Sequence, residues 1–270
     1  MINACIKISL IALLSFSSYF VTGQELESSF DDLETNLWFS SYNKFRISDK
    51  LFWAAEMHYR RIGSAENRPF IDRMAQIYNR HGINYVHSPK FNITVGGVLR
   101  LDFTPEPGNE ELKPLIIEPR IWHQYLFVMP FSRFMLYHRI RIEHRWSTNH
   151  RPDSEWLFRN RWRYSIYAKI PLNNPQLVPG TVYFSPSVEL ILQTGKPVVG
   201  SFIEDFRLYG NFGYIVSPRV SASMGLMYTT GQKTSDPTLY RRRYILRVST
   251  YISLDFRKKE RKIPAIKLSD

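Results

Sequence analysis

The longest regular pattern of hydrophobic and polar positions lies at residues 134–146, where the two kinds of side chain alternate without a break. One face carries Phe134, Leu136, His138, Ile140, Ile142, His144 and Trp146, and the other carries Tyr137, Arg139, Arg141, Glu143 and Arg145. Successive side chains of a β-strand point to opposite faces, so this pattern predicts a strand. A helix would distribute the arginines around its circumference and leave no apolar stripe. The stretch is longer than an ordinary strand of about 5–6 residues and suits a tilted membrane-spanning strand, which needs roughly 9–11.

Ten further stretches alternate in the same way and predict an all-β protein. Their approximate bounds are 33–45, 51–60, 71–86, 91–103, 115–128, 156–170, 181–193, 202–215, 220–228 and 240–256. Because one face is apolar and the other charged, they predict a single antiparallel transmembrane β-barrel with lipid outside and a polar lumen inside. Bacterial barrels close with an even number of strands, so we expect about 12 strands (10–12). Either residues 24–34 supply a twelfth crossing or one of the eleven segments is misassigned.

The connections between these segments alternate mostly between tight and long. Tight turns are expected near residues 48, 88, 131 and 217, and longer loops near 66, 108, 151, 198 and 234. Outer-membrane barrels have short periplasmic turns and longer external loops. The connection at 171–180 breaks the alternation, because it holds three prolines and is long where a short turn is expected. The same alternation starts the first strand, and with it the N-terminus, on the external side.

Residues 1–23 predict a signal peptide, because Lys7 precedes an apolar run and small residues follow that run. The predicted barrel then spans 24–256, and 257–270 form a basic C-terminal tail, expected to be a solvated periplasmic extension. Cys5 is the only cysteine and lies in the signal peptide, so the exported chain has no disulfide or thiolate metal site. No internal apolar run is long enough for a spanning helix.

The formal net charge of +12 and the 15% aromatic content indicate which binding partners to expect. A basic chain often binds nucleic acid or anionic surfaces, and export argues against nucleic acid. Trp and Tyr anchor at membrane interfaces. We therefore expect location in the bacterial outer membrane. The expected partners are outer-membrane lipids, the barrel-assembly machinery during biogenesis and small anions.

Charged residues on the predicted lumen faces are the main candidate site. This lumen charge ladder consists of Glu118, Arg120, Arg139, Arg141, Glu143, Arg145, Arg159, Arg161, Arg163, Arg207, Arg243 and Arg247. A tight turn at Phe131-Ser132 would set four pairs directly opposite each other: Glu118–Arg145, Arg120–Glu143, Trp122–Arg141 and Gln124–Arg139. Opposite-charge pairs of this kind each contribute roughly 0.2–1 kcal/mol. Two interpretations stay open: a structural barrel whose basic lumen is closed by salt bridges, or a narrow anion-attracting channel.

Two other functions also stay open. One of them is enzymatic, so whether the protein is an enzyme stays uncertain, and we lean towards a protein without enzymatic activity. An outer-membrane lipid hydrolase or deacylase needs a serine, a histidine and a polar orienter, and the nearest set is His144, Ser147 and Asn149. Residues three apart on a strand face opposite sides, so His144 and Ser147 meet only if the strand has ended. A soluble periplasmic ligand-binding β-sandwich or lipocalin-like barrel would instead pack the apolar face inside. We expect no catalytic residue, metal site or cofactor, since the remaining histidines lack ligand spacing and no phosphate-binding glycine loop is present.

Several motifs occur in a recognisable order along the chain. They are Trp38, Glu56 with Tyr59-Arg60-Arg61, the run EPRIWHQ at 118–124, the run YHRIRIEHR at 137–145 and the run RNRWRY at 159–164. Together they resemble the bacterial family catalogued as domain of unknown function 2490, over nearly the whole mature chain. The resemblance implies an exported outer-membrane β-barrel of Gram-negative bacteria. It implies no activity, cofactor or site residue.

Overall fold

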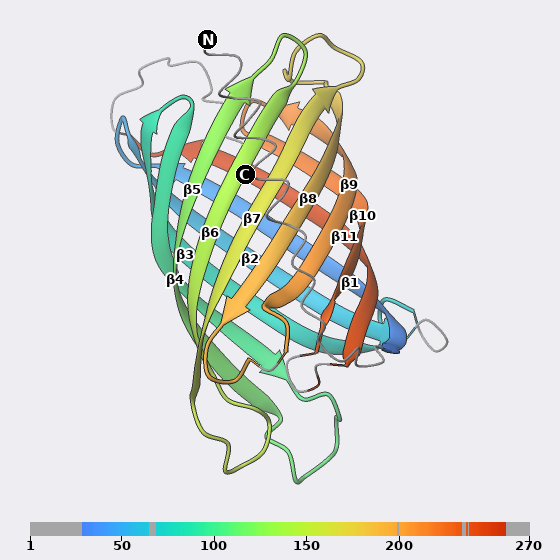
Figure 1. The fold of residues 1–270 in the computed structure, drawn as a ribbon. Coiled ribbons are helices and arrows are strands. Elements are labelled where there is room, and N and C mark those ends of the chain that lie inside the picture. The colour runs from blue at the N-terminus through green and yellow to red at the C-terminus, as the bar shows by residue number, and fades with distance from the viewer. Residues whose placement is uncertain (1–28, 65–68, 199, 234–235, 237, 258–270) are drawn as a thin grey trace, which may run out of the picture.

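The computed structural model describes residues 29–64, 69–198, 200–233, 236 and 238–257 of the 270-residue chain. Within them, eleven strands form one sheet that closes into a barrel (Figure 1). The strands are β1 (Ser29–Arg46), β2 (Leu51–Ser64), β3 (Arg73–Ser88), β4 (Phe91–Phe103), β5 (Leu115–Pro130), β6 (Met135–Ser147), β7 (Leu157–Pro171), β8 (Val182–Thr194), β9 (Ile203–Ser217), β10 (Val220–Gln232) and β11 (Leu239–Asp255). The predicted signal peptide and the predicted basic tail after Arg257 lie outside the described residues. No helix in these ranges is long and apolar enough to cross a membrane.

Each of the eleven stretches predicted from alternation is a strand, so the predicted all-β barrel is confirmed. Eleven strands fall within the expected range of 10–12. The preferred even number is not reached in the described part of the chain. The prediction offered residues 24–34 for a twelfth crossing. Residues 24–28 lie outside the described residues, and residues 29–34 form the start of β1.

The odd number of strands closes because β1 and β11 pair in parallel, whereas all other neighbouring strands are antiparallel. The parallel register runs from Ser29 opposite Leu239 to Arg46 opposite Asp255, and Figure 1 shows the blue β1 beside the red β11. A ring of purely antiparallel strands requires an even number, because each strand reverses direction. The expectation of a wholly antiparallel barrel is therefore wrong for this one pair of strands, β1 and β11.

The two ends of the barrel differ in their connections. The short-turn end carries the turns 47–50, 89–90, 131–134 and 218–219 together with the longer connection 172–181. The long-loop end carries the connections 65–72, 104–114, 148–156, 195–202 and 233–238, and two of these loops hang below the barrel in Figure 1. β1 starts at the long-loop end, and β11 finishes at the short-turn end.

The wall of the barrel is apolar outside and polar inside. Large hydrophobic side chains on the outer face are well exposed, including Ile121 (55%), Leu99 (56%), Val95 (54%), Met224 (58%) and Leu226 (51%). Charged side chains are buried inside, including Glu143 (0%), Arg120 (2%), Glu118 (2%), Arg145 (3%) and Arg80 (4%). The alternation along each strand produces this division, because neighbouring side chains point to opposite faces. The polarity is the reverse of that of a soluble domain, whose apolar side chains are buried.

Aromatic side chains gather on the outer face near both ends of the strands. At the short-turn end, three pairs of rings lie in contact, with centroid separations of 5.1 Å for Phe45–Phe256, 4.8 Å for Phe91–Phe127 and 4.7 Å for Phe131–Phe134. At the long-loop end, Trp146 lies 5.2 Å from Phe158, and Phe30 lies 6.1 Å from Tyr240. Two aromatic belts that flank an apolar band are typical of membrane-spanning barrels.

Two glycines let β3 and β4 approach closely, and they allow a test of the packing. Gly96 lies opposite Gly82, and a Cβ on Gly96 would lie 1.9 Å from the backbone oxygen of His81. We expect Gly96→Ala to lower the free energy of unfolding by about 1–3 kcal/mol, because a strand must shift to admit the methyl group. Thermal unfolding in detergent measures this loss. Gly97→Ala is the matched control, because its nearest neighbour would be the Arg120 backbone oxygen at 3.8 Å. Equal stability of the two variants would contradict the packing described.

Candidate functional site

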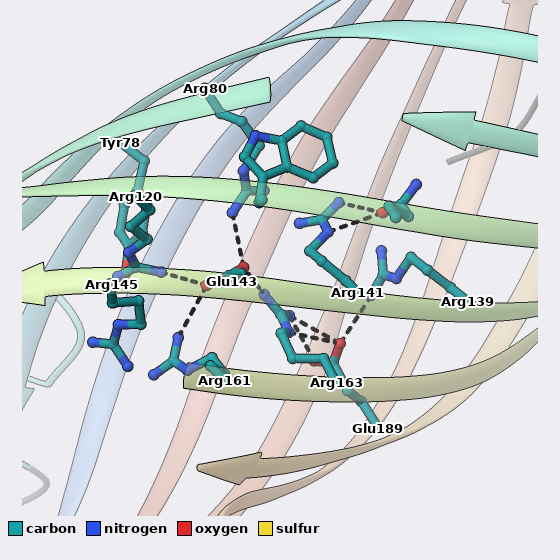
Figure 2. A network of polar contacts seen from close by, with 12 residues as sticks. Tyr78, Arg80, Arg120, Arg139, Arg141, Glu143, Arg145, Arg161, Arg163 and Glu189 are labelled. Carbon is teal, nitrogen blue, oxygen red and sulfur yellow. Dashed lines mark hydrogen bonds and ion pairs between the residues drawn. The ribbon is translucent and has the colours of Figure 1, made fainter. Parts of the chain in front are cut away.

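Glu143 on β6 is the centre of the charged network inside the barrel. Its side chain is fully buried and lies within ion-pair distance of four arginines. Its carboxylate oxygens lie 2.6 Å from Arg120 and 3.1 Å from Arg163, and 3.4 Å from Arg80 and 3.7 Å from Arg161. Figure 2 shows these side chains converging on the carboxylate from the surrounding strands. One negative charge thus holds together guanidinium groups from β3, β5 and β7.

Glu118 on β5 organises the network toward the long-loop end. Its carboxylate accepts hydrogen bonds from Arg120 at 2.6 Å, Arg145 at 2.9 Å and Arg100 at 3.2 Å. Hydrogen bonds between ionised groups are the stronger kind, and the arginine fork matches the two carboxylate oxygens. Glu118 therefore fixes three arginines from β4, β5 and β6.

Glu189 on β8 organises a third group of arginines. It accepts hydrogen bonds from Arg163 at 2.9 Å, Arg139 at 3.0 Å and Arg207 at 3.2 Å. Figure 2 places it against Arg163 and Arg139, which come from β7 and β6. Arg163 thereby bridges Glu189 and Glu143.

Several ion pairs join strands that are not neighbours in the barrel wall. Arg80 on β3 contacts Glu143 on β6, and Arg145 on β6 lies 3.4 Å from Glu204 on β9. Arg161 on β7 also pairs with Glu204. These pairs cross the lumen, so the network divides the interior of the barrel.

The predicted hairpin register was wrong by two residues. In the structure Arg120 lies opposite Arg145, Trp122 opposite Glu143, Gln124 opposite Arg141 and Leu126 opposite Arg139. The cause is the turn, which has four residues (131–134) and is closed by a hydrogen bond of 2.9 Å from the Phe131 N–H to the Phe134 carbonyl oxygen. The predicted charge partners still meet, because their long side chains reach diagonal positions: Arg120–Glu143 at 2.6 Å and Arg145–Glu118 at 2.9 Å. The other two predicted pairs, Trp122–Arg141 and Gln124–Arg139, are not directly opposite each other. Gln124 lies opposite Arg141 and accepts a hydrogen bond of 2.6 Å from it.

A cavity of about 80 Å³, here called the arginine cavity, lies among these ion pairs. Nine arginines line it: Arg60, Arg80, Arg120, Arg139, Arg141, Arg161, Arg163, Arg207 and Arg247. Among the described residues, Glu189 is the one carboxylate in its lining. An adjoining cavity of about 70 Å³ toward the short-turn end shares Arg139, Arg141 and Arg247 and is otherwise lined mainly by tyrosines and serines.

Two arginines of the cavity have no carboxylate within ion-pair distance in the described ranges. Arg60 donates to the Tyr78 hydroxyl at 3.1 Å, and its guanidinium lies 3.6 Å from the centroid of the Trp38 ring. Arg247 donates to the Tyr42 hydroxyl. Aromatic faces attract guanidinium groups and fix their orientation. Both guanidinium groups therefore lack a carboxylate partner in the described residues, and both arginines line the cavity.

Some predicted ladder residues lie away from the cavity, toward the long-loop end. Arg243 pairs with Glu34 at 2.5 Å, and Arg159 donates to the Ser147 hydroxyl at 3.5 Å. Of the ladder's arginines, Arg145 also lies outside the cavity lining, in contact with Glu118.

Sequence reasoning missed several members of the network. These are Glu56, Arg60, Arg80, Arg100, Glu189 and Glu204. Alternation places Glu56, Arg60, Arg80 and Glu189 at the polar positions of their strands, so their inward direction is predictable from the sequence. Glu56, for example, accepts a hydrogen bond of 2.6 Å from Arg80.

The residues considered for a hydrolase are not brought together. β6 continues to Ser147, whose side chain is buried in the lumen beside Arg159. His144 points the other way and lies 2.6 Å from the Asn160 side-chain oxygen through its Nδ1. The described residues also contain no group of three His, Cys, Asp or Glu that could hold a metal ion.

Comparison with known proteins gives a family and one distant likeness. The family model described as "Protein of unknown function (DUF2490)" matches residues 35–241. No curated protein matches the chain. Among solved structures, LpxR from Salmonella typhimurium is similar at 8% sequence identity, with a TM-score of 0.44, over 74% of this chain and 83% of that chain. A likeness this distant says nothing about function.

Proposed function

This chain belongs to the DUF2490 family of proteins of unknown function, and we propose that it is a bacterial outer-membrane β-barrel with a narrow, anion-attracting lumen. The family match confirms the resemblance that the sequence motifs carry. The observation that supports the proposal most strongly is the inverted polarity of the barrel. Ionised side chains such as Glu143 fill the inside, and apolar side chains such as Ile121 cover the outside.

A surrounding lipid bilayer removes the free-energy cost of exposing the apolar outer face to water. Each large apolar side chain left in water forgoes roughly 1.5–3 kcal/mol relative to burial, and dozens of them cover the outer face. A soluble ligand-binding barrel would carry its apolar residues inside, and a β-sandwich would not close into a ring. The two aromatic belts at the strand ends fit the two interfaces of a bilayer.

The surplus of arginine in the lumen supports attraction of anions. A lumen lined by one sign of charge between low-dielectric walls concentrates ions of the other sign. The cross-lumen pairs, such as Arg80–Glu143, restrict the passage to small ions. A second candidate, a purely structural barrel that is closed by these pairs, is favoured by the same contacts.

Conductance in planar bilayers tests the proposal. We expect small, anion-selective currents, with a reversal potential under a KCl gradient that follows chloride. The double variant Arg60→Gln/Arg247→Gln should lower the anion preference without leaving any carboxylate unpaired, because neither arginine has a carboxylate partner in the described ranges. Cation selectivity, or an unchanged preference in the variant, would contradict the proposal. Absence of any current would favour the structural barrel.

A further inference from the structure

We propose that the arginine cavity binds a tetrahedral oxyanion of the phosphate class. The inference rests on the proposed anion-attracting lumen and names its ligand. Seven of the nine lining arginines, all except Arg60 and Arg247, form ion pairs with carboxylates in the described part of the chain. The carboxylates are Glu56, Glu118, Glu143, Glu189, Glu204 and Asp205.

The charge of the cavity selects a multivalent anion. Since arginine stays protonated in proteins, the nine arginines leave a surplus of at least three positive charges over their carboxylate partners. Some of these carboxylates also serve arginines outside the cavity, as Glu118 serves Arg100. Crowded like charges repel strongly where water is scarce. A phosphate dianion compensates the surplus better than a single chloride does.

Unused hydrogen-bond donors point to the same ligand. Four buried nitrogen atoms on cavity-lining arginines have no partner in the described residues: Arg60 Nε, Arg80 Nε, Arg120 Nη2 and Arg247 Nε. Arg80 and Arg120 are only 4% and 2% exposed. Buried donors are normally satisfied, so these cavity-lining arginines hold unused hydrogen-bonding capacity. The planar arginine fork matches the oxygens of an oxyanion.

The size and rigidity of the cavity fit a compact ion. A volume of about 80 Å³ is several times the roughly 10–15 Å³ that one water molecule needs, so the cavity admits a compact ion. Trp38 and Tyr78 hold the Arg60 guanidinium from its faces, and Glu189 and Glu143 hold Arg163. The donors are therefore oriented before the ion arrives, which lowers the entropic cost of binding.

Titration calorimetry on the detergent-purified chain tests the inference, with inorganic phosphate, glycerol phosphate and chloride as probes. We expect phosphate to bind and to raise the unfolding temperature, and chloride to do neither at equal ionic strength. Binding of inorganic phosphate alone identifies the free ion as the ligand. Equal binding of glycerol phosphate identifies a phosphate ester, whose organic part occupies the adjoining cavity. Binding of neither phosphate compound overturns the inference.

Matched variants assign the binding to the cavity. Arg60→Gln should weaken phosphate binding by about tenfold or more, because a charged donor is lost. Arg159→Gln, a lumen-facing arginine outside the cavity, should leave phosphate affinity within about twofold of the native value. If Arg60→Gln does not fold, Arg60→Lys keeps the charge, removes the fork and should still weaken binding. Equal phosphate affinity of the Arg60 and Arg159 variants overturns the inference.

The two proposals fail in different ways. A barrel that is recovered in the outer membrane and carries chloride current, but binds no phosphate, overturns only the oxyanion site. A chain that binds phosphate through Arg60 but is recovered outside the membrane overturns the proposed location and leaves the site standing.

Discussion

Replacing Glu143 by glutamine should lower the free energy of unfolding by about 3–5 kcal/mol, because it removes one partner from a buried ion-pair network. The carboxylate is fully buried and faces four arginines. Glutamine keeps the shape of the side chain and removes its charge. The arginines cannot respond by losing a proton, so their mutual repulsion inside the barrel is no longer compensated.

Chemical unfolding of the purified barrel in lipid vesicles measures this loss. Glu110→Gln is the control, because Glu110 is an exposed residue of the loop 104–114, and its loss of charge should change stability by less than about 0.5 kcal/mol. A Glu143→Gln barrel as stable as the Glu110→Gln barrel would show that the central network does not hold the lumen together.

Placing an arginine on the outer face at mid-height should be the most damaging surface change. Val95 lies near the middle of β4, is 54% exposed and is flanked by Ile83 and His123 on the neighbouring strands. In a bilayer, Val95→Arg should cost about 2–4 kcal/mol, because the charge lies in hydrocarbon. On a soluble barrel the same change would be close to neutral, since it replaces an exposed apolar side chain by a charged one.

The yield of folded barrel in the membrane and its unfolding free energy in vesicles measure this effect. Gln176→Arg is the matched control, because Gln176 is exposed in the connection 172–181 between β7 and β8, outside the strands. If both variants fold with equal yield and stability, lipid does not surround β4.

The strands and the direction of their side chains were predictable, because they depend on local alternation. The stretch at 134–146 corresponds to β6, which begins and ends one residue later, and its arginines face the lumen as predicted. Charge pairing within the β5–β6 hairpin was predictable only in part. The predicted two-residue turn has four residues, which shifts each directly opposite pair, and the long side chains of Arg120 and Arg145 still reach the predicted carboxylates.

Features that depend on the closed ring were not predictable from local pattern. The parallel pairing of β1 with β11 joins the first and last strands of the sheet. Alternation within a strand does not show which other strand it pairs with, or in which direction. The same is true of contacts across the lumen. Arg80 was on a predicted polar face, but only the curvature of the closed sheet brings it to Glu143 on β6. The arginine cavity is a product of such contacts. Alternation predicted that seven of its nine arginines face the lumen, but it did not predict that they line one cavity.

The central claim is that lipid surrounds this barrel and that its charges face inward. Density separation of the membranes of the native host, followed by a urea wash, tests it most directly. We expect the mature protein in the washed outer-membrane fraction, where it should migrate faster in detergent gels before heating than after. Recovery of the protein as a soluble periplasmic monomer would contradict the claim.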